Sequence, residues 1–67
     1  MIMITLNGKP RELAAPVPIP ELLDDLGVAP RQVAVAINGE VVKRARWPEV
    51  MVGDADVVEV VRAVGGG

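Results

Sequence analysis

The chain has 67 residues with 51% hydrophobic content, which is enough for one small domain with an economical core. Cysteine and histidine are both absent, and this excludes a disulfide framework, a cysteine or histidine zinc site, a thiol nucleophile and the usual general base. A formal net charge of -2 gives no electrostatic reason to expect nucleic acid or an anionic membrane as a partner.

Residues 1–14 predict a β-hairpin. Side chains 1–6 alternate with period two and place isoleucine and leucine on one face. Asn7-Gly8 then supplies the positive φ angles that a type I′ turn requires, and residues 9–14 form a polar return strand at a sheet edge. The opening segment lacks the basic lead-in of a signal peptide, and no run approaches the roughly 20 apolar residues that span a bilayer. We therefore expect a cytoplasmic protein without a membrane partner.

A short helix is predicted after a proline-rich segment. Pro20 lies in its first turn, where proline is tolerated. The apolar stripe follows the spacing i, i+3, i+4 and i+7 and consists of Ile19, Leu22, Leu23 and Leu26. Gly27 is a natural terminator, because glycine adopts the left-handed conformation without strain. A helix of about two turns is marginal alone, so it must pack against a sheet.

Residues 33–43 predict a second hairpin with two unequal faces. Large and small residues alternate over 33–37, so the large ones fill the core while Ala34 and Ala36 leave the opposite face flat and apolar. Asn38-Gly39 repeats the tight-turn signal and leads into a short strand over 41–43.

Residues 44–52 are expected to be irregular, and residues 53–56 to form a turn. Trp47 is the only aromatic residue, and a lone tryptophan is more often the cover of a small core than an anchor for a partner. The basic run 43–46 is interpreted as a solvated loop in preference to a phosphate-binding patch. Asp54 and Asp56 lack a third oxygen-rich position, so they are interpreted as turn residues and not as cation ligands.

The order of these elements predicts the fold class. Residues 57–62 form the last strand, which is apolar on both faces except at Glu59, as in a central strand. A right-handed crossover that places this strand parallel to the first gives an α+β, β-grasp (ubiquitin-like) fold, with a mixed five-stranded sheet and one crossover helix on one face. We expect residues 1–62 to form this domain and residues 63–67 to be a flexible tail.

The three terminal glycines have no packing use in a folded domain. Glycine orders at a high entropic cost, so such a tail gains order only inside a partner that surrounds it. Because cysteine and histidine are missing, the one reactive group of the tail is the carboxylate of Gly67. Five residues beyond Arg62 carry this carboxylate roughly 16 to 18 Å from the domain, far enough to reach a buried active site.

A docking surface is predicted beside the tail. Side chains alternate along residues 57–62, so those that point away from the helix join the two alanines of the neighbouring strand. They form a shallow apolar patch with a charged rim. The residues predicted to contact a partner are Ala34, Ala36, Glu59, Val61 and Arg62.

Short segments spread over the whole chain carry a resemblance to a known family. They are Ile4-Thr5-Leu6-Asn7-Gly8, Leu22-Leu23 with Leu26-Gly27, residues 33–39 followed by Glu40-Val41-Val42, residues 56–61, and Val64-Gly65-Gly66-Gly67. In this order they resemble the ThiS family, the sulfur carriers of thiamin thiazole synthesis. Ala55 departs from the family pattern, which has glycine before the aspartate, and Gly53 is expected to serve that turn instead.

The resemblance implies that a ThiF-like adenylyltransferase uses ATP to activate the Gly67 carboxylate to an acyl-adenylate. Sulfur from a donor protein then replaces one oxygen, and the thiocarboxylate delivers sulfur to a ThiG-like thiazole synthase. Val64, Gly65 and Gly66 form the tail that enters the partner, and glycine at 65 and 66 lets the chain thread a channel that is too narrow for side chains. Without cysteine the chain cannot hold a persulfide, so any sulfur that it carries must sit on its C-terminus. The chain is then a co-substrate without a bound cofactor, and not an enzyme.

Other functions share this tail chemistry. The nearest are sulfur carriers for molybdopterin synthesis or for tRNA thiolation. A more distant one is a ubiquitin-like modifier that is conjugated to lysines through Gly67. The chain length and the two Asn-Gly hairpins favour the thiamin carrier.

Overall fold

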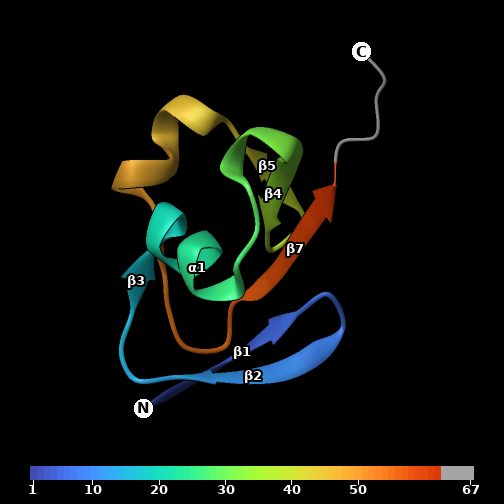
Figure 1. The fold of residues 1–67 in the computed structure, drawn as a ribbon. Helices are drawn as coiled ribbons and strands as arrows, with labels where there is room; N and C mark the ends of the chain where they lie inside the picture. Colours follow the sequence, from blue (N-terminus) through green and yellow to red (C-terminus); the bar gives the residue numbers. More distant parts are fainter. Residues whose placement is uncertain (63–67) are drawn as a thin grey trace.

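A computed structural model describes residues 1–62, and Figure 1 shows the fold. In this part of the chain the main sheet has five strands: β1 (Ile2–Leu6), β2 (Lys9–Leu13), β4 (Val33–Ile37), β5 (Glu40–Val42) and β7 (Val57–Arg62). The other elements are helix α1 (Ile19–Leu26), the 3-10 helices η1 (Pro30–Gln32) and η2 (Arg44–Glu49), and the short strands β3 (Val17–Pro18) and β6 (Met51–Val52).

The main sheet has the strand order β2-β1-β7-β4-β5. Strands β1 and β7 run parallel, and the other neighbours are antiparallel. Helix α1 lies on one face of the sheet and connects its two hairpins, and the last strand of the chain is the central one (Figure 1). The predicted β-grasp fold is confirmed.

Asn-Gly pairs close both hairpins of the sheet. Asn7 and Asn38 have φ angles of 50° and 52°, and the glycines that follow them have 82° and 85°. Two left-handed central residues define the type I′ turn, whose twist matches that of the strands it joins. The residues that flank each turn therefore pair directly, and the predicted hairpins are confirmed.

Helix α1 buries its predicted apolar stripe and ends at the predicted glycine. The residues that it buries are Ile19, Leu22 and Leu23. Gly27 has a φ angle of 74° and donates its N–H to the Asp24 carbonyl at 3.1 Å, and the Val28 N–H bonds to the Leu23 carbonyl at 3.2 Å. These two bonds satisfy carbonyls at the helix end. No helix within residues 1–62 is long and apolar enough to cross a membrane.

The core lies between α1 and the sheet. Its buried side chains are Ile4, Leu13, Ile19, Leu22, Leu23, Val33, Val35, Trp47, Val52 and Val58. Trp47 is only 4% exposed, its Nε1 donates to the Val42 carbonyl at 3.0 Å, and the Arg44 guanidinium carbon lies 5.3 Å from its ring centroid. Trp47 therefore covers the core, as predicted, and is not an exposed anchor.

Residues 44–52 are more ordered than the irregular segment that was predicted. Helix η2 occupies 44–49, and β6 pairs with β3 so that Val52 lies opposite Val17. Val52 is fully buried, and the Ile19 N–H bonds to the Val50 carbonyl at 3.3 Å, which ties this segment to the start of α1. Strands of two residues have no periodicity, so the sequence pattern does not reveal them.

The turn before β7 also differs from the prediction. Ala55 has a φ angle of 70°, whereas Gly53 does not adopt a positive φ. Gly53 therefore does not take over the role of the glycine missing at position 55, and this prediction is wrong. Tertiary bonds hold the turn in place: the Ala55 N–H donates to the Met3 carbonyl at 2.8 Å, and the Met3 N–H donates to the Asp54 carboxylate at 2.9 Å.

Candidate functional site

Strand β7 leads to the tail and lies at the centre of the sheet, between β1 and β4. Its antiparallel register with β4 continues to its last residue, where Arg62 lies opposite Val33. Val64, Gly65, Gly66 and Gly67, which were predicted to form the channel tail and its sulfur-carrying end, lie outside the described residues. The strand that precedes them is held on both sides.

The turn residue Asn7 extends the pairing of β7 beyond the end of β1. Strand β1 ends at Leu6, opposite Val58. The carboxamide of Asn7 then takes the place of a backbone unit: its Oδ1 accepts from the Val60 N–H at 2.8 Å, and its Nδ2 donates to the Val60 carbonyl at 3.2 Å. A side chain thus forms the last hydrogen-bonded step on this side of β7.

Asn38 fastens the beginning of β7 from the other side. Its Oδ1 accepts from the Val57 N–H at 2.9 Å, and its Nδ2 donates to an Asp56 carboxylate oxygen at 3.1 Å. Its backbone N–H donates to the Val57 carbonyl at 2.7 Å. Sequence reasoning missed this second role of the two turns, because an Asn-Gly pair predicts a turn but does not indicate which strand the asparagine will meet.

The sheet face opposite to α1, here called the open face, carries four of the five predicted docking residues. Ala34 lies opposite Val61, and Ala36 lies opposite Glu59. By strand alternation and register, three more exposed apolar side chains extend this face. The exposed set comprises Met3 at 47%, Val41 at 76%, Val57 at 46% and Val61 at 59% exposure. Sequence reasoning missed the first three, although the same alternation followed along every strand indicates them.

Arg62 does not belong to the open face. Side chains alternate along β7, so Arg62 shares the side of Val58 and Val60, and its cross-strand partner Val33 is buried in the core. Arg62 therefore ends the strand on the helix side of the sheet, beside the start of β4. The residues predicted to form one docking surface are divided between two faces, and their role in docking stays a prediction.

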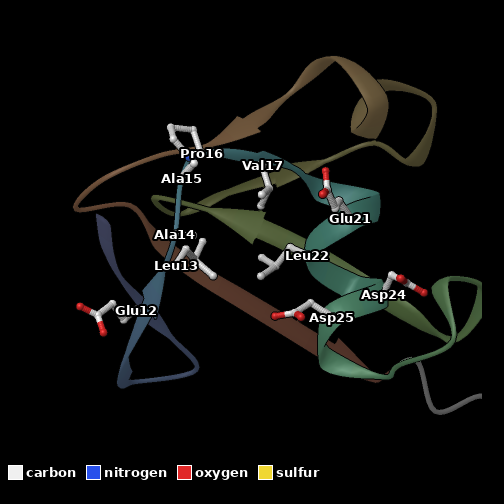
Figure 2. A pocket seen from close by; sticks show the side chains of 10 residues that line it. All are labelled: Glu12, Leu13, Ala14, Ala15, Pro16, Val17, Glu21, Leu22, Asp24 and Asp25. Atoms are coloured by element: carbon white, nitrogen blue, oxygen red, sulfur yellow. The ribbon is translucent and has the colours of Figure 1, made fainter. Parts of the chain in front are cut away.

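A groove of about 530 Å³ lies between the end of β2 and α1 (Figure 2). Its acidic residues are Glu12, Glu21, Asp24 and Asp25, and Figure 2 shows their carboxylates spread around the groove without a common focus. One of them is already paired, since Arg11 Nη2 lies 3.0 Å from Asp25 Oδ2. Within residues 1–62 no three acidic side chains gather as metal ligands would. The groove therefore lacks the convergent groups of a catalytic or metal site.

Comparison with known proteins identifies the family. A model of the ThiS family matches residues 4–67, which include the main sheet from Ile4 in β1 onward and the terminal glycines. The chain belongs to the ThiS family. The predicted resemblance is therefore confirmed, and the β-grasp core described above is a ThiS domain.

Relatives of similar length support this membership. The sulfur carrier protein ThiS of Thermus thermophilus is 40% identical over 65 residues, which cover 97% of this chain and 100% of the relative. The crystal structure of the thiamine biosynthesis protein ThiS from Geobacter metallireducens has a TM-score of 0.88 and 39% identity, and the match covers 98% of this chain and 100% of that one.

Longer relatives contain a ThiS-like segment. A thiazole synthase from Paramagnetospirillum magneticum is 39% identical over 64 residues, which are 96% of this chain and 20% of that protein. A thiazole synthase from Magnetococcus marinus is 42% identical over 64 residues, again 20% of its length. The chain thus spans about a fifth of the length of these curated relatives.

Proposed function

We propose that this ThiS-family chain carries sulfur on its C-terminal Gly67 as a thiocarboxylate, for thiazole formation in thiamin biosynthesis. The observation that carries the proposal is the family match, which runs through the β-grasp domain and includes the terminal glycines. The fold supports it, because the strand that leads to these glycines is the central one and is fastened on both sides.

The chemistry requires activation before sulfur transfer, because a carboxylate is a poor electrophile. The Gly67 carboxylate attacks the α-phosphate of ATP, and pyrophosphate leaves. A hydrosulfide equivalent that a donor protein supplies then attacks the acyl carbon of the acyl-adenylate, AMP leaves, and loss of the S–H proton gives the thiocarboxylate. Because the chain has no cysteine or histidine, we assign the catalytic groups of both steps to partner enzymes, the first of them a ThiF-like adenylyltransferase. In this proposal the chain is a co-substrate that binds no cofactor of its own, and the reaction takes place in the cytoplasm.

A ThiG-like thiazole synthase is the proposed acceptor of the sulfur. Two thiazole synthases contain a segment that is about 40% identical to nearly the whole of this chain. In those proteins the carrier-like segment and the synthase are covalently linked, so they meet at a high effective concentration. The linkage supports a direct encounter between this chain and a separate thiazole synthase.

The open face is the proposed contact for these partners. Strands β1, β7, β4 and β5 contribute exposed apolar side chains to one side of the sheet, and Ala34 and Ala36 keep its middle flat. Contiguous apolar surface of this kind marks interaction sites on soluble domains. Val61 places the edge of this surface directly beside the start of the tail.

Intact mass spectrometry tests the proposed function. The purified chain is incubated with a ThiF-like adenylyltransferase, ATP and a sulfur donor, and the expected product has one oxygen replaced by sulfur. A chain extended by one alanine after Gly67 is the matched control, because it keeps the domain but displaces the carboxylate by about 3.5 Å. Attachment to lysines instead of sulfur incorporation would identify a protein modifier.

Complementation then tests the pathway. The chain is expected to restore growth of a thiamin auxotroph that lacks its own sulfur carrier. Rescue of a molybdopterin mutant without rescue of the thiamin auxotroph would contradict the proposal.

A further inference from the structure

Basic side chains gather at the end of the sheet where β7 ends. Arg62 ends β7 opposite Val33, the first residue of β4. The Val33 carbonyl accepts from Arg44 Nη2 at 3.4 Å, and the same nitrogen donates to the first carbonyl of η1 at 3.1 Å. Arg31 lies in η1, and Lys43 directly precedes Arg44. The exposed residues Arg31, Lys43, Arg44 and Arg62 are here called the basic rim.

The basic rim has no acidic counterpart in the described part of the chain. The ion pairs found within residues 1–62 join Arg11 to Asp25 and Arg46 to Glu49, and neither pair includes a rim residue. The turn at the opposite end of β7 holds two aspartates instead. In a protein with a net charge of -2, four cations at one end of the sheet produce a local positive potential.

The length of the tail determines which ligand the rim can meet. Gly67 follows Arg62 by five residues, so an extended tail separates its reacting carboxylate from the rim by roughly 16 to 18 Å. When the carboxylate reaches the phosphates of ATP, the rim therefore lies outside the channel. Its anionic ligand is then the protein surface around the channel mouth, and not the nucleotide.

We propose that the basic rim binds an acidic protein surface at the mouth of the adenylyltransferase channel. This inference rests on the proposed function and adds to it the chemistry of a second contact. The partner holds the base of the tail from two sides, through apolar contacts on the open face and through ion pairs on the helix side. Charges at such a rim accelerate association and orient the encounter, so the contact is sensitive to salt.

Steady-state kinetics of ATP–pyrophosphate exchange test the rim, because this reaction reports adenylation alone. For the full chain, Arg31→Glu and Arg62→Glu are each expected to raise KM roughly tenfold at low salt, with kcat unchanged, and added salt reduces the difference. Arg46→Glu is the control: it makes the same charge change at a side chain already paired with Glu49 at 2.9 Å, and its KM stays within about twofold of wild type.

The outcomes separate this inference from the proposed function. If wild-type chain supports exchange and both rim variants match Arg46→Glu, the rim proposal is overturned while the proposed function stands. A fall in kcat with unchanged KM overturns it as well, since a docking contact acts on binding. Lys43→Glu replaces any rim variant that circular dichroism shows to be unfolded. A wild-type chain that no adenylyltransferase accepts overturns both proposals.

Discussion

Ala55 holds a backbone conformation that costs an L-residue free energy, because its Cβ approaches the following carbonyl oxygen. At a φ angle of 70° this cost is roughly 1 kcal/mol for alanine and is absent for glycine. The conformation persists because neighbouring bonds require it. The Ala55 N–H bonds to Met3 in β1, and Asp56 accepts from the Gly53 N–H at 2.8 Å.

We predict that Ala55→Gly stabilises the protein by up to about 0.5 kcal/mol, because the relief of roughly 1 kcal/mol of strain exceeds the added entropy of the unfolded chain. Urea unfolding followed by circular dichroism measures this change. Gly53→Ala is the comparison without strain: its φ is not positive and a Cβ there would meet only an Asp56 oxygen at 3.9 Å, so only the unfolded-state entropy changes and a gain of about 0.4 to 1 kcal/mol is expected. A less stable Ala55→Gly protein would show that the turn is not strained.

Strand β7 illustrates, at the scale of elements, how much the sequence could predict. Valine at four of the six positions indicated a central strand, and the Asn-Gly pairs indicated both hairpins beside it. The alternation of side chains also predicts that Arg62 lies on the helix side of the sheet, when it is continued past Val61. The bonds from Asn7 and Asn38 to β7 could not be predicted, because they depend on the final distance between a turn and a strand that is far away in sequence. The terminal glycines carried the functional prediction without any structure.

The two asparagines give an element-scale prediction. Asn7→Asp removes the donor to the Val60 carbonyl and sets a carboxylate oxygen against it, so a loss of about 1 to 2 kcal/mol is expected. Asn38→Asp removes the donor to an Asp56 carboxylate oxygen and places a second carboxylate beside it, and we expect a loss of stability at least as large.

Hydrogen exchange separates the two variants of this prediction. Exchange of the Val60 amide is expected to accelerate in Asn7→Asp more than in Asn38→Asp, because the new carboxylate oxygen repels the Val60 carbonyl and pushes away the side-chain oxygen that accepts from the Val60 amide. Equal acceleration in both variants would mean that β7 opens as one unit and that Asn7 has no local effect.

At the scale of the whole molecule, the two faces of the sheet differ in polarity and charge. The open face carries exposed apolar side chains from β1, β7 and β5 beside the two alanines of β4, with Glu59 among them, whereas Arg62 lies on the helix side where β7 ends. The acidic groove between β2 and α1 lies on a different part of the surface (Figure 2). This division predicts that the effect of a substitution on KM for adenylation depends on the face that carries it, and not simply on the charge that it introduces.

Ala34→Arg and Val61→Asp test the open face with opposite charges. Both place a charge in an apolar contact, so both are expected to raise KM for adenylation more than roughly tenfold without unfolding the domain. Ala15→Arg, at an exposed position in the acidic groove, is the control and leaves KM unchanged. Opposite effects of the two charged variants would indicate an ionic contact in place of an apolar one.

The central position of β7 also has a mechanical consequence. Under the proposed function the chain withdraws its tail from one enzyme before it enters the next, and this withdrawal would pull along the axis of β7. Ladder bonds run across the strand to β1 and β4, so this pull loads them in shear, all together and not one after another. The two asparagine side chains add bonds to the same load. We therefore expect the sheet to resist a pull along β7, so that the proposed withdrawal of the tail does not unfold the domain.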